Sequence, residues 1–142
     1  MYFKLLWYAA VCPQFQKFWY RSVYNFKKKN VHYRPWGRYV NLFVGKGFLI
    51  KELYVKSKGV LSLQMHHHRA EHWLVTQGCP KITLNKDNFS KKTNDHIFIP
   101  LGAVHRIRNP NKKPVKIIEV QVGSILKETD IVRFADIYGR IK

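Results

Sequence analysis

Residues 61–73 read LSLQMHHHRAEHW, a stretch that places four of the chain's seven histidines within seven consecutive positions. Successive side chains of a β-strand point to opposite faces, so every second residue of this stretch shares a face. One face then carries Ser62, Gln64, His66 and His68, and the other carries Leu61, Leu63, Met65 and His67. The alternation predicts a strand with one polar, imidazole-rich face. Two interpretations are open: a solvated strand that happens to be rich in histidine, or a set of metal ligands aimed at one point.

Short segments of this kind follow one another along most of the chain. From residue 38 onward, runs of β-branched and aromatic residues are separated by Gly, Pro, Asn and Asp, the pattern of strands joined by turns. Strands are predicted over residues 38–44, 48–56, 61–68, 72–77, 81–85, 96–99, 104–108 and 115–122, with turns that include 85–88 and 100–102. Eight strands at this spacing predict an all-β protein, a closed or sandwiched antiparallel barrel of the jelly-roll type. A short helix is expected around residues 130–138, in the C-terminal tail.

The first thirty residues differ in composition from the rest, because they contain ten aromatic residues and neither Asp nor Glu. We therefore divide the 142 residues into a divergent N-terminal extension, residues 1–30, and one domain, residues 31–142, which is long enough to bury a core. The apolar run 5–11 is shorter than the about 20 residues that a membrane-spanning helix needs. Only Lys4 precedes this run, and no convincing cleavage site follows it. Neither a membrane span nor secretion is expected.

The charge is strongly positive: 26 Lys and Arg residues against 8 Asp and Glu give +18. Such a charge makes an anionic partner worth considering, whether nucleic acid, an acidic membrane surface or a phosphorylated metabolite. The cations form short clusters at 27–29, 91–92 and 112–113, not the long basic stripe of nucleic-acid-binding modules. A solvated, lysine-rich surface is the favoured interpretation, and nucleic acid is not an expected partner. Cys12 and Cys79 lack Cys-x-x-Cys spacing, which favours reduced thiols in a cytoplasmic protein.

Two separated motifs carry the most specific information. The first is Gln64-x-His66-x4-Glu71-x6-Gly78, and the second is Pro100-x-Gly102-x2-His105-x3-Asn109. Together they resemble the two sequence motifs of the cupin superfamily, whose fold is a jelly-roll barrel. This chain departs from the pattern in three places. Gln64 replaces the leading histidine, Asn94 stands where the second motif opens with glycine, and Gly59 is displaced by one residue from the first motif's opening glycine.

A closer resemblance extends over residues 31–142. The segments Arg34-Pro35-Trp36-Gly37, 61–73, Ile118-Glu119-Val120-Gln121-x-Gly123 and Tyr138-Gly139-Arg140 resemble the type II mannose-6-phosphate isomerase domain. In that family the domain is usually the C-terminal part of a bifunctional enzyme that is also a mannose-1-phosphate guanylyltransferase. The 142 residues leave no room for the guanylyltransferase part, so we expect a stand-alone domain or a fragment of a split bifunctional enzyme. The resemblance also implies a homodimer, and a separate nucleotidyltransferase is a possible partner.

The resemblance implies that mannose 6-phosphate and fructose 6-phosphate are interconverted through an enediol, with a divalent metal as cofactor. The implied metal ligands are Gln64, His66, Glu71 and His105, with His68 as a substitute ligand or outer hydrogen-bond partner. Zn, Mn, Co and Fe all suit such a set. The predicted catalytic residues are Glu119 and Arg140, and the predicted binders of the sugar phosphate are Lys51, Arg69, Arg106 and Arg133.

Purely structural interpretations of the same residues remain open. Glu119 is equally well explained as a buried, hydrogen-bonded carboxylate, each arginine as a surface charge, and Trp36 and Trp73 as packing residues. For the whole chain, the favoured function is an isomerase in GDP-mannose and surface-polysaccharide biosynthesis. One alternative is a non-catalytic cupin that binds a sugar phosphate. A less favoured alternative is a nucleic-acid binder. A nucleic-acid binder would lose affinity steeply with salt.

Overall fold

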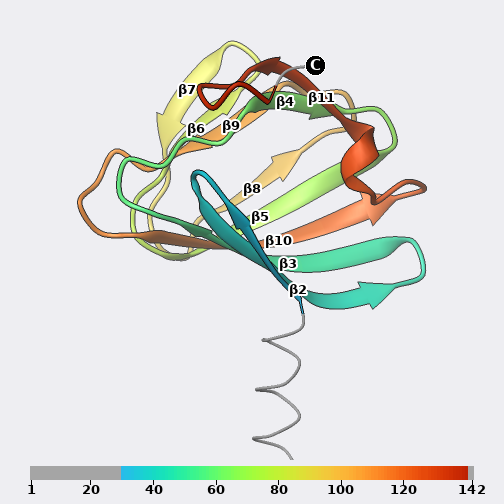
Figure 1. Cartoon of the computed structure of the whole chain (residues 1–142). Coiled ribbons are helices and arrows are strands. Elements are labelled where there is room, and N and C mark those ends of the chain that lie inside the picture. The colour runs from blue at the N-terminus through green and yellow to red at the C-terminus, as the bar shows by residue number, and fades with distance from the viewer. Residues whose placement is uncertain (1–29, 141–142) are drawn as a thin grey trace, which may run out of the picture. The chain divides into compact units, whose positions relative to one another are not determined.

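The computed structural model describes residues 30–140, in which a compact unit begins at His32. Two β-sheets face each other in this unit (Figure 1). The first sheet has six strands in the order β1-β2-β3-β10-β5-β8. Their bounds are β1 Val31–Arg34, β2 Gly37–Gly45, β3 Phe48–Val55, β10 Val115–Gly123, β5 Arg69–Gln77 and β8 His96–Ile99.

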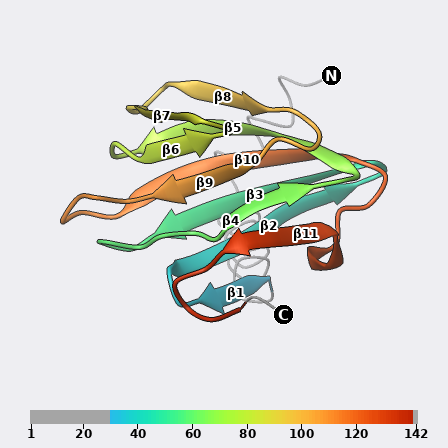
Figure 2. The ribbon, with the colours of Figure 1, turned by 90° about the horizontal axis from the view of Figure 1, so that it is seen from above.

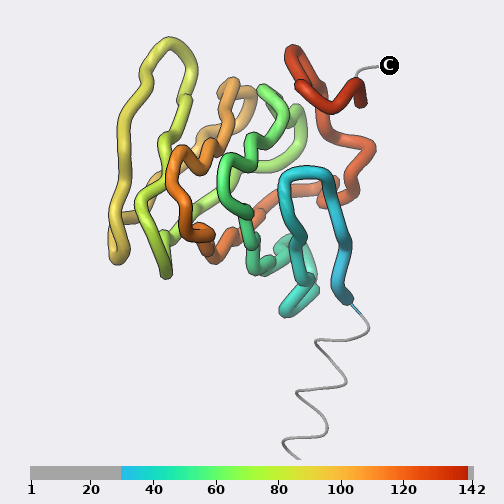
Figure 3. The backbone as a smooth tube through the Cα atoms, turned by 60° about the vertical axis from the view of Figure 1, so that its left-hand side comes forward, coloured from blue at the N-terminus to red at the C-terminus, as the bar shows by residue number. Residues whose placement is uncertain are grey.

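The second sheet has five strands in the order β11-β4-β9-β6-β7. Their bounds are β11 Ile131–Ala135, β4 Leu63–His66, β9 His105–Arg108, β6 Lys81–Leu84 and β7 Asp87–Ser90. Figure 2 shows β11 alongside β4, at one edge of this sheet. After β3 the chain passes to the second sheet, and it changes sheets repeatedly from there to β11, a path that can be followed in Figure 3. Antiparallel strands that cross between two facing sheets are the jelly-roll architecture that the sequence predicts.

The interior of the first sheet is divided into an apolar and a polar half. Strand register places residues of neighbouring strands in rows across the sheet, and each row contributes its side chains to one face. One inward row is apolar and consists of Val75, Ile117, Leu53 and Tyr39. The next inward rows are mainly polar, and they consist of Trp73, Glu119, Lys51 and Asn41, and of Glu71, Gln121 and Leu49. The apolar half continues into the core, which includes Val55, Ile82, Ile107 and Val115, all fully buried.

The eight predicted strands are all present, with ends that differ by a few residues. The strand expected over 61–68 is confined to Leu63–His66, and β5 begins at Arg69 instead of His72. Three strands were not expected, β1, β7 and β11, and β7 begins inside the predicted turn 85–88. Among the described residues no helix is long and apolar enough to cross a membrane. Residues 1–29 of the N-terminal extension, including Cys12, lie outside the described residues. Cys79 is a free, exposed thiol.

The prediction of a helix around residues 130–138 is wrong. A single 3-10 turn, η1, spans Glu128–Asp130, and the chain then forms strand β11. Strand β11 pairs antiparallel with β4, and Ile131 lies opposite His66. This long-range pairing decides the conformation of the tail, because tertiary contacts override the weak local preference of such a short segment.

At two positions where the cupin motifs have glycine and this chain does not, the backbone still adopts a conformation that glycine favours. Lys58, one residue before Gly59, has φ of 60°, and Asn94 has φ of 75°. Both lie in the left-handed region that glycine favours and that asparagine tolerates better than most residues. Asn94 therefore suits its position, whereas Lys58 is strained there, although its ammonium group donates a hydrogen bond to the Pro110 carbonyl.

Replacing Lys58 by glycine should raise the free energy of unfolding by about 0.5–1 kcal/mol, because the left-handed region costs a residue with a Cβ about 1–2 kcal/mol. Part of that gain is offset by the greater freedom of glycine in the unfolded chain. Urea unfolding followed by circular dichroism measures the change. Lys56→Gly is the matched control, since Lys56 is not among the residues with positive φ. It should lose about 0.5–1 kcal/mol. Equal losses in both variants would contradict the argument.

Candidate metal centre and cavity

Three buried side chains converge between the two sheets. His66 ends β4, His105 begins β9, and Glu71 lies on β5 of the facing sheet. Each is about 1% exposed. The Nε2 atom of His66 is 3.1 Å from Oε1 of Glu71, and the Nε2 atom of His105 is 3.6 Å from Oε2 of the same carboxylate. One ligand atom from each residue lies within 4.8 Å of the others, a spacing that suits a shared metal ion.

The backbone fixes which ring nitrogens face the centre. The Nδ1 atom of His105 is 2.9 Å from the Ala103 carbonyl oxygen, and Nδ1 of His66 is 3.4 Å from that of Asp130. A ring that donates from Nδ1 keeps the Nε2 lone pair free for a metal. The Nε2 atom of His105 is buried and has no hydrogen-bond partner among the described residues, and burial lowers the pKa of this imidazole. A neutral ring with an unpartnered nitrogen fits a metal ligand.

Glu71 stays ionised although it is buried. Burial alone would raise its pKa, but the hydrogen bond with His66 and nearby positive charge, including that of Arg69, lower the pKa to about 2. The Arg69 guanidinium is also buried, with Nε 3.4 Å from Oε1 of Glu71 and one terminal nitrogen 3.4 Å from Nε2 of His66. A carboxylate that is charged at neutral pH is the state that binds a divalent cation.

A second buried carboxylate, Glu119, is tied to Glu71 by two shared donors. Trp73 donates from Nε1 to one oxygen of each carboxylate, at 3.1 Å in both cases. Gln121 donates from Nε2 to the other oxygen of each, at 3.1 Å to Glu71 and 2.7 Å to Glu119. Burial, together with the negative charge of Glu71, raises the pKa of Glu119 to about 8. The two carboxyl groups therefore differ in protonation near neutral pH, a condition that suits one of them to proton transfer.

A cavity opens beside these groups and encloses about 460 Å³ of space not filled by atoms, including the part open to solvent. The charged side chains that line it are Arg34, Lys51, Arg69, Arg133, Arg140, Glu71, Glu119 and Glu128. The deepest cations are Arg69 and Lys51, whose side chains are 1% and 7% exposed, whereas those of Arg34 and Arg140 are 31% and 25% exposed. Cations thus line the cavity from its floor to its opening, as a polyanionic ligand requires.

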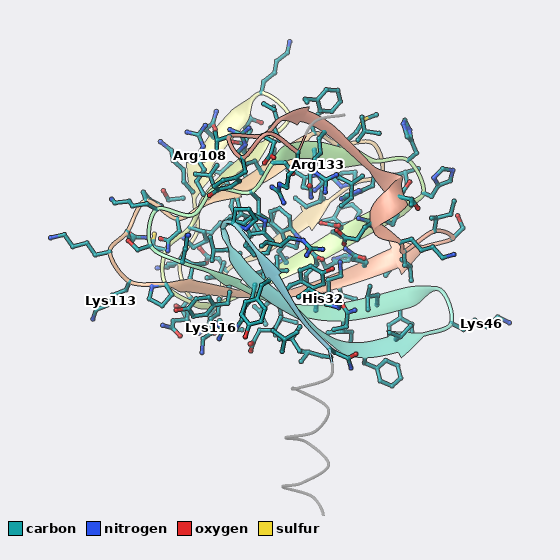
Figure 4. All side chains as sticks on the ribbon, viewed as in Figure 1. His32, Lys46, Arg108, Lys113, Lys116 and Arg133 are labelled. Atoms are coloured by element: carbon teal, nitrogen blue, oxygen red, sulfur yellow. The ribbon has the colours of Figure 1, made fainter. Side chains whose placement is uncertain are left out.

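Most of the predicted site residues meet at this cavity. Lys51 lies between two carboxylates, 3.2 Å from Glu128 and 3.9 Å from Glu119. Arg133 lies under β11, on the side facing the first sheet (Figure 4), and its Nε is buried without a hydrogen-bond partner in the described part of the chain. Arg140 also lines the cavity, but its guanidinium is bound to Asp136 at 2.7 and 2.9 Å.

Two predicted residues, Arg106 and His68, are placed differently, whereas a third, Gln64, lines the cavity. Arg106 does not line the cavity; its neighbour His105 points inward, and the Arg106 guanidinium instead donates to the Ala135 carbonyl at 3.2 Å. His68 lies outside the ligand cluster, because its half-exposed ring bonds Asp130 at 2.7 Å. Gln64 lines the cavity opposite His105 in the β4–β9 register, and its Oε1 accepts from Ser62 at 2.8 Å. A ligand role for Gln64 stays a prediction.

Asp130 is an important residue that the sequence reasoning missed. Its buried carboxylate accepts hydrogen bonds from the backbone N–H groups of His67 and His68, each at 3.3 Å, and contacts Arg69 at 3.5 Å. These contacts hold the turn between β4 and β5, and therefore the direction in which His66 points. The sequence offers no local signal for this role, because the partners of Asp130 are 61 to 63 residues away along the chain.

Trp73, Gln121 and Arg34 were also not assigned to the site. The signal for Gln121 was present, since it alternates with Glu119 on the inward face of β10. Trp73 is buried as expected of a core residue, and its indole N–H gives it a polar role as well. Arg34 directly precedes the Pro35-Trp36 pair, and Trp36 packs in the core and lines the cavity.

Removing one imidazole should remove the metal. Losing an outer hydrogen-bond partner of a metal ligand typically lowers metal affinity about 10–100-fold. His105→Ala removes a ligand itself, so it is expected to lower the affinity for Mn, Co or Zn by more than that. Elemental analysis after equilibrium dialysis measures the bound metal. His96→Ala, which removes an exposed histidine of β8, is the control and should bind as the wild type does. Unchanged binding by His105→Ala would rule out the proposed centre.

The Asp136–Arg140 pair should make stability fall at acid pH. Hydrogen bonds from the Arg140 side chain lower the pKa of Asp136, despite an opposing effect of burial. Because the folded pKa is below the unfolded value of about 3.9, the carboxylate stabilises the fold above that pH, and the contribution is lost as the pH falls through the folded pKa. Urea unfolding at pH 5 and pH 3 should show a weaker pH dependence for Asp136→Asn than for the wild type. Asp87→Asn, which changes an exposed carboxylate, should behave as the wild type; identical slopes for all three proteins would contradict this role.

Comparisons with known proteins agree with the fold. Residues 22–136 match the family described as mannose-6-phosphate isomerase C-terminal. The chain is 53% identical over 108 residues to the alginate biosynthesis protein AlgA of Pseudomonas fluorescens, which covers 76% of this chain and 22% of that protein. It is 50% identical over 109 residues to the mannose-1-phosphate guanylyltransferase of Escherichia coli K12, covering 77% of this chain and 23% of that protein. The matched part is thus under a quarter of the length of these relatives.

Among solved structures, a cupin 2 conserved barrel domain protein from Salinispora arenicola superposes with a TM-score of 0.59 at 18% identity, covering 68% of this chain and 84% of that one. The likeness identifies the fold as a cupin barrel. Together with the match over residues 22–136, it shows that the chain belongs to the mannose-6-phosphate isomerase C-terminal family.

Proposed function

We propose that this domain interconverts mannose 6-phosphate and fructose 6-phosphate with the help of a divalent metal. The observation that carries the proposal is the convergence of His66, Glu71 and His105 beside a cation-lined cavity that also contains Glu119. An aldose–ketose isomerisation needs a base near the sugar and positive charge near the developing oxyanion. Both requirements find candidates in this cavity.

His66, Glu71 and His105 would hold the metal, with Gln64 as a further ligand from β4. When bound, a divalent metal supplies positive charge that stabilises an oxyanion. The mixed nitrogen and oxygen donors suit Zn, Mn, Co or Fe. The neutral His105 ring and the ionised Glu71 support this role, because both are in the protonation state that binds a metal.

The cations of the cavity would bind and orient the phosphate. The Nε of Arg133 is buried and has no hydrogen-bond partner among residues 30–140, and the Arg34 side chain is partly exposed. Guanidinium groups match phosphate oxygens in geometry and charge. A phosphate held by these two residues would leave the other end of the sugar free to reach the floor of the cavity. The deeper Lys51 would then lie near the sugar, where Glu128 now contacts it at 3.2 Å.

Glu119 is the proposed general base. It lines the cavity, and Trp73 and Gln121 hold its carboxyl group in one orientation. Its pKa of about 8 supports the role, because a base whose pKa lies near the working pH can both accept and return a proton. Arg140, held by Asp136, would act as a fixed positive charge at the opening.

In its biological setting, the activity would supply sugar phosphates for GDP-mannose and surface-polysaccharide synthesis. The AlgA relative, named for alginate biosynthesis, supports this setting. A separate nucleotidyltransferase partner, a homodimer and a cytoplasmic location stay predictions. Lys46 and Lys113 project at opposite ends of the described domain (Figure 4), a scatter that favours a solvated surface over a nucleic-acid site.

The decisive variant is Glu119→Gln. It should lower the rate of fructose 6-phosphate formation from mannose 6-phosphate by about 10²–10⁴-fold, the usual contribution of a general base. A coupled assay with metal-loaded protein measures the rate, and elemental analysis shows whether the metal is retained. Glu52→Gln, a carboxylate on the neighbouring strand β3 that does not line the cavity, is the matched control and should keep the wild-type rate.

Two results would contradict the proposal in different ways. Turnover that survives Glu119→Gln would exclude this base but leave the isomerase intact. Metal-loaded wild type that binds sugar phosphate without turnover would instead favour the non-catalytic cupin.

A further inference from the structure

Gln121 has a side chain whose orientation is fixed by its neighbours. It lies on β10, is 1% exposed and lines the cavity. Its Nε2 donates to Glu71 at 3.1 Å and to Glu119 at 2.7 Å. The ionised Glu71 carboxylate can only accept hydrogen bonds, so the opposite orientation would place the amide oxygen against an acceptor. The nitrogen must therefore face the carboxylates, and the oxygen must point elsewhere.

The amide oxygen is left without a partner. Oε1 of Gln121 is buried and has no hydrogen bond to any described residue. Buried polar atoms are nearly always hydrogen-bonded, because an unsatisfied one costs about 1–3 kcal/mol. Since Gln121 lines the cavity, the missing donor can come from a molecule that enters it. Because the two carboxyl groups fix the amide, its oxygen is a selective acceptor: it favours ligand groups that donate a hydrogen bond and disfavours anionic groups.

We infer that Oε1 of Gln121 accepts a hydrogen bond from a hydroxyl group of the bound sugar phosphate. The inference rests on the proposed function and adds a residue that selects the sugar. A phosphate oxygen carries no suitable hydrogen, whereas a sugar hydroxyl donates readily. The metal is a poorer partner, because Gln121 already presents its amide nitrogen, which cannot bind a metal, to the ligand Glu71.

One consequence is selectivity for a particular hydroxyl. A site built to hydrogen-bond a hydroxyl group discriminates against analogues that lack it, because its own polar atom then stays unpaired. Gln121 would therefore favour the sugar that presents a hydroxyl at this point. Its Nε2 would at the same time keep Glu119 oriented, so that one side chain connects recognition of the sugar with positioning of the proposed base.

The test uses mannitol 6-phosphate, which lacks the carbonyl group and so binds without turnover. Calorimetry on the metal-loaded protein compares this ligand with derivatives that lack one hydroxyl at a time. The wild type should bind one derivative about tenfold more weakly than the parent, the loss of one hydrogen bond. Gln121→Met should bind the parent about tenfold more weakly and no longer distinguish that derivative from it.

Trp73→Phe is the matched control. Trp73 and Gln121 both donate to Glu71 and Glu119, so each substitution removes a donor shared by the carboxylates, but only Gln121→Met removes the free acceptor. Trp73→Phe should keep the wild-type preference among the derivatives. All three proteins are compared at saturating metal, with the content checked by elemental analysis, because both substitutions remove a donor to the ligand Glu71.

Three outcomes would overturn the inference alone: a wild type that treats all derivatives alike, a preference that survives in Gln121→Met, or a preference that Trp73→Phe also loses. A crystal structure of the wild type with mannitol 6-phosphate gives an answer that does not depend on the folding of any variant. It must place a ligand hydroxyl within about 3 Å of Oε1; any other partner overturns the inference. A wild type that does not bind mannitol 6-phosphate would overturn the proposed function itself.

Discussion

Two carboxyl groups buried side by side within a β-barrel are the constraint that organises this domain. Glu71 and Glu119 are 1% and 6% exposed, and moving an ionised carboxylate out of water is among the most expensive steps in folding. The surrounding residues offset this cost. Trp73 and Gln121 donate to both groups, Arg69 contacts Glu71, and Lys51 lies near Glu119. What remains is an asymmetry, in which one carboxyl is ionised and the other holds its proton more tightly.

The fold makes this arrangement possible by dividing its interior. Rows of paired residues across β5, β10 and β3 are apolar at one end of the barrel and polar toward the cavity. The apolar half, with Val55, Ile107 and Val115 fully buried, provides hydrophobic stabilisation, about 25 cal/mol for each Å² removed from water. The polar half carries the groups of the candidate site and does not add to this hydrophobic stabilisation. A rigid apolar scaffold next to a polar site keeps reacting groups in fixed geometry.

The sequence was informative wherever the evidence was local. The alternation in residues 61–73 predicted a polar face that includes His66 but did not decide whether that face was solvated. The motif spacing grouped His66 with Glu71 and His105, and these three side chains lie close together in the structure. The same alternation, applied to β9, would have shown that Arg106 points away from His105. The tail was misread because the identity of β11 depends on its pairing with β4, which no local pattern reveals. For the same reason Asp130 was assigned to a helix, although its partners lie in the turn after β4.

The contacts of Asp130 also bear on how the domain assembles. They span 61 to 64 residues of chain, and they position the ring of His66 through the Asp130 carbonyl. Contacts that close such long loops must overcome the entropy of closure before they can stabilise the chain, and the β3–β10 pairing, whose partners are similarly far apart, carries the same cost. The ligand cluster is thus complete only in forms of the chain in which these long-range contacts are present. An ion that binds only the completed cluster adds its affinity to the native state alone, and so favours the fully assembled barrel over every partly folded form.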